Sequence, residues 1–320
     1  MKDKWSRNIE YLRISVTDRC NLRCFYCMPD EGVNKLCHNE ILSFEELYDI
    51  VKAAVELEIK KVRITGGEPL VRLGVVDFIG KISKLPELED IAMTTNGMLL
   101  EKYAQKLKAA GLKRLNISLD TLKEDKFHQI TRRGDLKQVL RGIEIAQKVG
   151  LSPIKINTVI MKGINDDEIR DFVNLTIEKS YQVRFIELMP MGEAEDIEDK
   201  RFMSNEEVME KIPGLVPIIN GDDLGPAKYY QLPGAKGKIG FISPMSNHFC
   251  NTCNRIRLTA DGKIRPCLHS NIEIDVKKAI RNHSRDIKKI LGESILAKPE
   301  RHHLNEKRKS SIRNMNEIGG

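Results

Sequence analysis

The pattern of hydrophobic and polar positions predicts that strands and helices alternate through most of the chain. Six short segments are rich in Ile, Val, Leu or Thr, or alternate apolar with polar residues, and several run into Gly, Asn or Asp. These features are typical of buried β-strands that end in turns. The predicted strands are residues 11–17, 61–65, 91–95, 114–119, 154–160 and 182–188.

Helical patterns fill the intervals between these segments. The helix expected over residues 43–58 opens with Ser43, and Glu46 lies three residues further on, which is the signature of a capping box. Between residues 136 and 146 the apolar side chains follow a period of about 3.6 residues. Residues 165–178 open with Asn-Asp-Asp, an acidic, cap-rich start that complements the helix dipole.

This alternation predicts an α/β fold in which helices cover a parallel sheet. Six units form either a partial (β/α)6 barrel or an open doubly wound sheet, and periodicity does not distinguish the two. In both, functional groups collect beyond the carboxyl ends of the strands. Eight Gly or Pro residues between positions 221 and 244 predict a break in regular structure. We therefore expect a strand–helix domain over residues 1–220 and a C-terminal extension over residues 221–320.

Composition places the chain among soluble globular proteins. Hydrophobic residues make up 41% of it and charged residues 31%. No run approaches the roughly 18 apolar residues that span a membrane, and the first residues lack the apolar core of a signal peptide. Seven cysteines without an export signal fit a reducing, cytoplasmic setting in which thiols are ligands or catalysts.

The positive charge is concentrated near the C-terminus. The formal net charge is +7, and residues 276–313 hold twelve Lys or Arg against four Asp or Glu. A basic segment of this kind can bind a polyanion. It contains no aromatic residue for base stacking, however, so we favour a solvated helix face and expect no nucleic-acid partner.

Three cysteines within eight residues are the strongest chemical signal. Cys20, Cys24 and Cys27 form a C-x3-C-x2-C run directly after the first predicted strand. A 4Fe–4S cluster takes four thiolates, so three would leave one iron open to bind a small molecule. The alternatives are a zinc site, which usually has four ligands, and three separate buried thiols.

A second cysteine triad lies in the C-terminal part. Cys250 and Cys253 are followed by Cys267, and the intervening sequence contains Asp261-Gly262, a strong hairpin signal. A two-residue turn there would pair Ala260 with Lys263, Leu258 with Arg265 and Ile256 with Cys267. The hairpin would then return Cys267 toward Cys253.

The chemistry of this second triad stays open between a cluster and zinc. Three cysteines with His248 or His269 would make a Cys3His zinc site, whereas two triads in one chain favour a matched pair of clusters. Arg255 and Arg257 share one strand face, where they suit an anion or a planar hydrogen-bonding ligand, or form a solvated face. Cys37 is left over as an ordinary free thiol or a fourth ligand.

These motifs resemble the GTP 3′,8-cyclase family of radical S-adenosylmethionine enzymes, which begin molybdenum-cofactor biosynthesis. The first triad and Gly66-Gly67-Glu68-Pro69 are similar to the superfamily's cluster loop and methionine-binding turn. The second triad, the two arginines beside it and the ending Ile318-Gly319-Gly320 are specific to the family. The resemblance extends from Tyr11 to Gly320.

The resemblance implies a partial (β/α)6 barrel (an incomplete TIM barrel) with a 4Fe–4S cluster at each end of a channel, the second cluster in the C-terminal extension. It implies that S-adenosylmethionine yields a 5′-deoxyadenosyl radical that abstracts the ribose 3′ hydrogen of GTP. C3′ then attacks guanine C8 and forms (8S)-3′,8-cyclo-7,8-dihydroguanosine 5′-triphosphate. The cofactor carries this chemistry, while the protein positions the reactants and excludes water.

The resemblance also implies roles for individual residues. The cluster ligands would be Cys20, Cys24, Cys27, Cys250, Cys253 and Cys267. The residues that contact S-adenosylmethionine would be Tyr26, Gly67, Ser118 and Met189. Those that contact GTP would be Arg13, Lys61, Arg63, Thr94, Lys155, Arg255 and Arg257. Arg184, Gly319 and Gly320 would serve the catalytic step. Alternatively, the inward cations pair with internal carboxylates such as Glu187.

The implied partners are GTP, a low-potential electron donor, the downstream cyclic pyranopterin monophosphate synthase and, in a homodimer, a second copy; no membrane partner is expected. A different radical enzyme that modifies a peptide is the alternative within the superfamily. A zinc-bearing nucleic-acid-binding protein is the alternative outside it. No role is assigned to Cys37 or to the basic residues 298–313.

Overall fold

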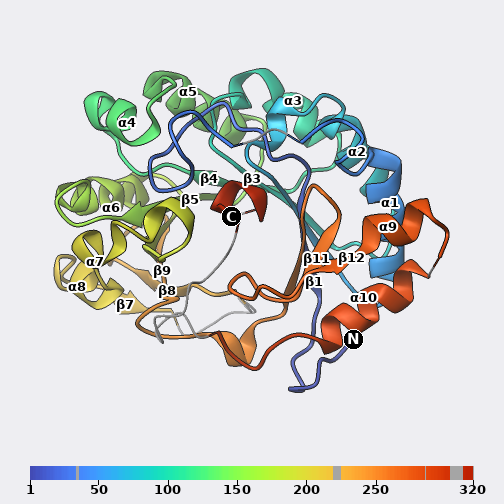
Figure 1. Ribbon diagram of the computed structural model, residues 1–320. Coiled ribbons are helices and arrows are strands. Elements are labelled where there is room, and N and C mark those ends of the chain that lie inside the picture. The colour runs from blue at the N-terminus through green and yellow to red at the C-terminus, as the bar shows by residue number, and fades with distance from the viewer. Residues whose placement is uncertain (34–35, 219–224, 285, 303–312, 320) are drawn as a thin grey trace.

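A twelve-stranded, mostly parallel sheet organises the computed structural model (Figure 1). The structure describes residues 1–33, 36–218, 225–284, 286–302 and 313–319. The six predicted strands are confirmed, with ends shifted by at most two residues, and they pair in chain order, each parallel to the next. They are β1 (Tyr11–Ser15), β2 (Lys61–Thr65), β3 (Asp90–Thr95), β4 (Arg114–Ser118), β5 (Ile154–Ile160) and β6 (Gln182–Glu187).

Strands from the C-terminal part extend this sheet on both sides. β10 (Arg255–Leu258) pairs parallel with β1, and β9 (Lys238–Ile242) pairs parallel with β6. The remaining strands add antiparallel edges. They are β7 (Val216–Pro217), β8 (Lys228–Gln231), β11 (Lys263–Arg265) and β12 (Ile274–Asp275).

Helices surround the outer face of the curved sheet in Figure 1, and the C-terminus lies inside the curve. They are α1 (Phe44–Val55), α2 (Val75–Ile82), α3 (Leu100–Ala109), α4 (Glu124–Thr131), α5 (Leu136–Lys148), α6 (Ile169–Glu178), α7 (Glu198–Arg201), α8 (Asn205–Glu210), α9 (Val276–Arg281) and α10 (Ile287–Leu296). The capping box predicted at Ser43 and Glu46 is present at the start of α1. No helix among the described residues is long and apolar enough to cross a membrane.

Strand alternation assigns one face to the core and the other to the interior of the curve. Leu12, Ile14, Val62 and Ile64 are fully buried in the hydrophobic core with the helices. Their neighbour Arg13 alternates with Leu12 and Ile14, so it faces the opposite side. The interior of the curve therefore receives the polar side chains of the strands.

The predicted register of the hairpin was wrong by one residue. Arg257 pairs with Arg265 and Leu258 with Ile264, so the turn has three residues rather than two. Gly262 ends this turn with a φ of +79°, in the left-handed region that a three-residue hairpin requires at that position. A shift of one residue exchanges the two faces of a strand, so Arg265 joins Arg257 on one face and Ile264 joins the core.

Two further expectations needed correction. Residues 166–168 form a 3-10 turn before α6, and the Asn165 side chain donates to the carbonyls of Asp120 and Val159 instead of capping the helix. In the Gly- and Pro-rich region, β8 and β9 form despite the predicted break, because most of its described glycines and prolines fall in the flanking segments and turns. Gly240, inside β9, packs closely against Tyr229. Part of that region, residues 219–224, lies outside the described residues, and the domain boundary at 220 stays a prediction.

Candidate active site

A cavity of about 390 Å³ lies inside the curve of the sheet. All six triad cysteines line it, together with every predicted ligand-contacting residue and Arg184. Its described lining contains nine Lys and Arg residues but only one carboxylate, Asp120. The structure thus brings the predicted site residues together around one positively charged space.

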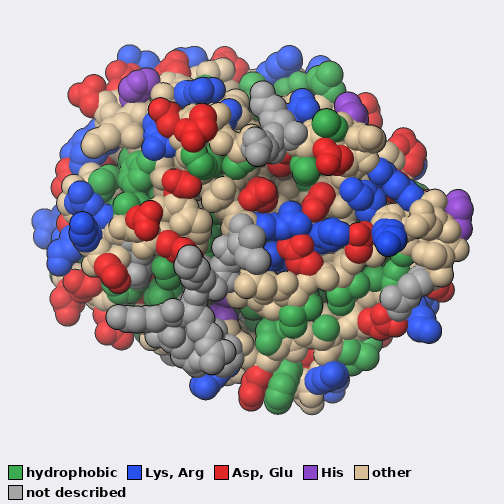
Figure 2. All heavy atoms as spheres, in the orientation of Figure 1, with side chains coloured by type: hydrophobic (Ala, Val, Ile, Leu, Met, Phe, Trp, Pro, Cys, Tyr) green, Lys and Arg blue, Asp and Glu red, His purple; other side chains and the backbone are tan. Residues whose placement is uncertain are grey.

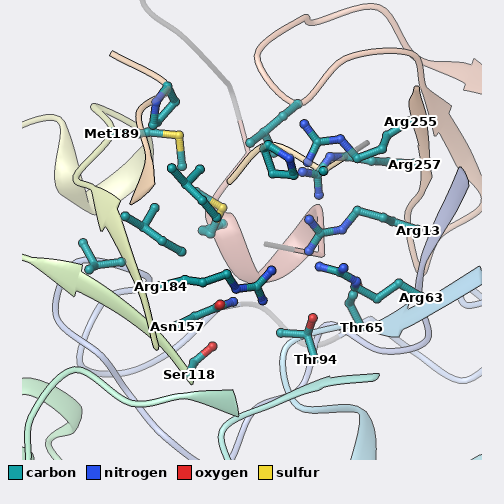
Figure 3. Close-up of a pocket in the computed structure, with 18 of the residues that line it drawn as sticks. Arg13, Arg63, Thr65, Thr94, Ser118, Asn157, Arg184, Met189, Arg255 and Arg257 are labelled. Carbon is teal, nitrogen blue, oxygen red and sulfur yellow. The ribbon is translucent and has the colours of Figure 1, made fainter. Parts of the chain in front are cut away.

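Three arginines stand in a row across neighbouring strands. Arg13 of β1 is in register with Arg63 of β2 on one side and with Arg257 of β10 on the other. Figure 3 shows these side chains and Arg255 reaching into the cavity from one wall, with Arg184 of β6 opposite. Adjacent strands lie about 5 Å apart, so the row concentrates positive charge at one level of the sheet.

Burial and mutual repulsion disfavour the charged forms of these arginines. Burial, followed by the charges of Arg257 and Arg63, holds the pKa of Arg13 well below its usual range. Burial, followed by Arg255, lowers the pKa of Arg257 to about 9. Burial also lowers the pKa of Arg184 to about 10. A buried cation of this kind requires a compensating negative charge, which a bound anion would supply.

Several buried polar atoms in the cavity wall have no hydrogen-bond partner among the described residues. They are Nε of Arg63, Oγ1 of Thr94, Oδ1 of Asn157 and Nε of Arg184. Buried polar groups are normally paired, so an unpaired set that faces one cavity indicates a polar ligand. The alternative that Glu187 pairs with the cations is wrong, since its carboxylate accepts from the backbone N–H groups of Asn205, Met245 and Ser246.

The first triad lies beyond the carboxyl end of β1. Cys20, Cys24 and Cys27 are close enough to raise one another's pKa, although burial is the main cause. Burial raises the pKa of Cys20 to about 11 and that of Cys27 to about 12. Thiols that cluster in such surroundings fit a positively charged metal centre, which converts them into thiolate ligands.

The glycine turn after β2 packs directly against the chain that leads to this triad. A Cβ atom on Gly67 would lie 2.4 Å from the carbonyl oxygen of Arg19, so no other residue fits there. The N–H groups of Gly67 and Glu68 donate to the carbonyls of Thr17 and Arg19 at 2.8 Å each. The turn therefore holds the loop before Cys20 while its other side lines the cavity.

Tyr26 is the aromatic residue within the first triad. Its hydroxyl donates to Oδ2 of Asp120 at 2.6 Å, and Asp120 also accepts from the N–H of Val159 at 2.9 Å. Burial raises the pKa of Asp120 to about 6 in spite of these bonds. Asp120 thereby fixes Tyr26 at the edge of the cavity.

The second triad has a different electrostatic setting. Burial alone would raise the pKa of Cys253, but the charges of Arg255 and Lys298 outweigh it and lower the pKa to about 6. Cys250 interacts electrostatically with both Cys267 and Cys253. The sulfurs therefore converge, as the hairpin predicted, although through a different register.

Histidines adjoin this second triad. The ring of His302 lies 4.3 Å from that of His248 and 4.6 Å from that of His269, measured between centroids. His248 contacts the carbonyl of Pro244 through Nδ1 at 2.8 Å, whereas Nδ1 of His269 is buried without a partner among the described residues. In the described ranges, no three His, Cys, Asp or Glu side chains form a preorganised site for a single metal ion. The three thiols of each triad line the same cavity.

The C-terminal segment enters the same space. The carbonyl of Gly319 accepts from the Arg257 guanidinium at 2.7 Å. Gly319 has a φ of +67°, and a Cβ atom there would lie 2.3 Å from Oγ1 of Thr65. Only glycine fits this position. Gly320 lies outside the described residues.

Several lining residues escaped the sequence analysis. Asp120, Asn157 and Lys298 all line the cavity. Asp120 follows a predicted strand, so the rule for the carboxyl ends of strands could have indicated it. Asn157 lies inside the predicted strand 154–160, two residues after Lys155 and therefore on the same face. Lys298, which donates to the carbonyls of Arg255 and Pro266 at 2.7 Å each, had no local signal.

Comparisons with known proteins agree with this arrangement. Residues 14–176 match the model of the radical SAM superfamily, and residues 181–304 match that of Molybdenum Cofactor Synthesis C. The crystal structure of Streptococcus suis SuiB bound to S-adenosylmethionine has a TM-score of 0.61 at 16% identity, covering 95% of this chain and 75% of that chain. The likeness to SuiB concerns the fold alone. The fold and the superfamily match define the chain as a radical S-adenosylmethionine protein.

The particular family follows from closer relatives. Proteins named GTP 3′,8-cyclase from Alkaliphilus oremlandii (strain OhILAs) and Alkaliphilus metalliredigens (strain QYMF) are each 56% identical, with all of both chains covered. One from Petrotoga mobilis is 52% identical, again over the whole of both chains. The chain belongs to the GTP 3′,8-cyclase family.

Proposed function

We propose that the chain converts GTP into (8S)-3′,8-cyclo-7,8-dihydroguanosine 5′-triphosphate as the first step of molybdenum-cofactor biosynthesis. The observation that carries this proposal is the single cavity that joins two cysteine triads through a wall of buried cations. Such a wall matches a triphosphate, because charge-assisted hydrogen bonds from guanidinium groups to phosphate oxygens are the strong ones.

The two triads would hold two 4Fe–4S clusters within a partial (β/α)6 barrel. Cys20, Cys24 and Cys27 are the proposed ligands of the first, and Cys250, Cys253 and Cys267 those of the second. When bound, the first cluster would supply the electron for reductive cleavage of S-adenosylmethionine, and the resulting 5′-deoxyadenosyl radical would take the ribose 3′ hydrogen. Bond formation between C3′ and C8 would leave an unpaired electron on the guanine, and one further electron from the proposed donor, together with a proton, would complete the dihydroguanine product.

The residues of the chain would position both ligands beside the first triad. Gly67, Tyr26, Ser118 and Met189 would hold S-adenosylmethionine, since all four line the cavity at the carboxyl ends of the strands. Close placement of this cofactor and the ribose would supply the reaction geometry, and the largely buried wall would keep water from a reactive radical.

The cationic residues would bind GTP. The triphosphate would take its contacts from Arg13, Arg63, Arg257, Arg255, Lys61 and Lys155, with Thr94 as a further donor. Arg184, opposite the arginine row, would complete the neutralisation of charge. Gly319 and Gly320 would serve the catalytic step, and the hydrogen bond between the Gly319 carbonyl and Arg257 would hold them near the reacting groups.

The proposal includes a low-potential electron donor, a cytoplasmic setting, and transfer of the product to cyclic pyranopterin monophosphate synthase. A homodimer is also part of it. On the face shown in Figure 2, basic and acidic side chains are interspersed. The prediction of no nucleic-acid partner stays a prediction.

The deciding experiment is anaerobic incubation of the reconstituted protein with GTP, S-adenosylmethionine and a reductant. Mass spectrometry should find a cyclised product isobaric with GTP, together with 5′-deoxyadenosine. ATP in place of GTP is the control and should yield no cyclised product. The proposal would be contradicted if iron and sulfide analysis found no cluster in the reconstituted protein. Formation of 5′-deoxyadenosine without any nucleotide product would also contradict it.

A further inference from the structure

The described C-terminal residues 313–319 connect the surroundings of the two triads. The N–H of Asn316 lies close enough to the Cys27 sulfur to favour its thiolate form, and the side-chain Nδ2 of Asn316 donates to the carbonyl of Asp18 at 3.1 Å. Three residues later, the carbonyl of Gly319 accepts from Arg257 at 2.7 Å. Asn316 and Ile318 are almost fully buried. The segment therefore lies in the cavity wall, where small displacements would move both contacts.

Arg313 begins this segment and makes its strongest polar contacts. Its guanidinium donates to both carboxylate oxygens of Asp261, at 3.1 and 2.8 Å, and to Oε2 of Glu273 at 2.9 Å. Its Nε lies 2.7 Å from Oε1 of Glu273. We call these three residues the Arg313 cluster.

The Arg313 cluster differs from an ordinary surface ion pair. Exposed pairs contribute little, but bidentate and networked geometry is the recognised exception. The three side chains are only 16–23% exposed, and Arg265, which is 1% exposed, also pairs with Glu273. Folding thus brings four charged groups together at one point.

The position of this cluster connects it to the active site. Asp261 lies in the turn between β10 and β11, and Glu273 immediately precedes β12. The same hairpin carries Arg257 on β10 and leads to Cys267 after β11. Arg313 therefore ties the C-terminal segment to the element that bears the second triad and one member of the arginine row.

We propose that Arg313 is a positioning residue whose pairing with Asp261 and Glu273 holds residues 314–319 in the cavity. Through this pairing it places the Gly319 carbonyl on Arg257 and the Asn316 N–H on Cys27. Its effect on turnover rests on the proposed function, whereas its effect on the position of the segment does not.

Hydrogen exchange of the anaerobic holoenzyme tests the placement directly. Arg313→Gln removes the charge but keeps a polar side chain. Peptides covering residues 313–320 should exchange roughly tenfold faster in this variant than in wild type. Arg301→Gln is the matched control, because it removes the same charge from an exposed side chain and should leave this exchange unchanged. Wild-type exchange in Arg313→Gln would overturn the proposal, whatever reaction the protein catalyses.

Turnover separates a positioning role from a general loss of structure. In Arg313→Gln the yield of cyclised product per 5′-deoxyadenosine should fall about tenfold, with iron content unchanged. Arg301→Gln, the matched control, should leave this yield unchanged. Loss of iron in Arg313→Gln, or a wild-type yield, would show that Arg313 does not position the segment.

Rescue in trans gives the sharpest contrast. A peptide of residues 310–320 should restore turnover to Arg313→Gln protein that lacks residues 319–320. The same peptide with Gln at position 313 should not. Asp261→Asn protein, which lacks the receiving carboxylate, should respond poorly to either peptide. Equal rescue by both peptides would refute the role of Arg313.

Discussion

Replacing Arg184 with Met is expected to stabilise the ligand-free protein while impairing its function. Only 4% of Arg184 is exposed, and burial is the main reason that its pKa falls from 12.5 to about 10. A base whose pKa is lowered by folding is less stable in its charged form inside the protein than in the unfolded chain. Met retains most of the aliphatic bulk without the charge.

The size of the effect follows from that pKa. The difference between 12.5 and about 10 corresponds to roughly 3 kcal/mol that the charged guanidinium costs the folded state. This cost is present at every pH below about 10 and is relieved only as the pH rises from there to 12.5. Loss of the hydrogen bond to Asn116 offsets about 1–2 kcal/mol. A net gain of about 1–2 kcal/mol should raise Tm by roughly 2–4 °C.

Anaerobic thermal unfolding, with and without GTP, measures the stability of the ligand-free protein and the stabilisation that GTP adds. Arg184→Met should unfold at a higher temperature than wild type without nucleotide, and its cyclisation rate should fall at least about tenfold. Arg7→Met is the matched control. Arg7 is equally buried, but it pairs with Asp3 at 2.7 Å and donates to the carbonyl of Cys250 at 2.8 Å. Its loss should destabilise the protein by roughly 3–5 kcal/mol.

The two substitutions should therefore change Tm in opposite directions, because Arg7 already has a carboxylate partner and Arg184 has none among the described residues. If Arg184→Met and Arg7→Met lower Tm alike and Arg184→Met cyclises GTP at the wild-type rate, Arg184 is a structural residue. The reasoning from the cationic cavity would then be refuted.

Four further outcomes are expected. Cys24→Ala and Cys253→Ala should each retain about half the iron, because each removes one of two clusters; only Cys24→Ala should abolish reductive cleavage of S-adenosylmethionine, and one zinc per chain would contradict this. Lys155→Ala should weaken GTP binding about tenfold or more in calorimetry while S-adenosylmethionine binding stays nearly intact; equal loss of both would indicate a folding defect. Deletion of residues 319–320 should abolish cyclisation but leave both clusters, and wild-type turnover would show a passive tail. Burial raises the pKa of Glu68 from 4.5 to about 7, so between these pH values the folded protein keeps a proton that the unfolded chain has lost. The free energy of unfolding should therefore fall by about 3 kcal/mol as the pH rises from 4.5 to 7. Urea titrations across this range should show a smaller fall for Glu68→Gln than for wild type.

The sequence by itself determined strands β1–β6, the starts of α1 and α5, and many of the residues that line the cavity. The alternation of polar and apolar residues in strands and the 3.6-residue period of helices are local patterns, so they can be recognised without knowledge of the fold. The C-x3-C-x2-C run is likewise contiguous, and an iron–sulfur site could be predicted from its residue type and spacing, whereas the role of the Gly66-Gly67 turn was implied by the family resemblance. Lys61 and Arg63 lie two residues apart in a predicted strand and therefore share a face, whereas the inward placement of Arg13 was implied by the family resemblance.

Tertiary structure alone decided which of these groups meet. Arg257 reaches Arg13 because β10, more than two hundred residues later in the chain, pairs beside β1. The hairpin register depended on a left-handed Gly262, and one residue of slip exchanged its faces. Glu187 was a plausible internal counter-ion by sequence, yet the fold gives it three backbone N–H groups instead. Contacts of this kind depend on strand order and loop paths, which a local pattern of hydrophobic and polar residues does not contain.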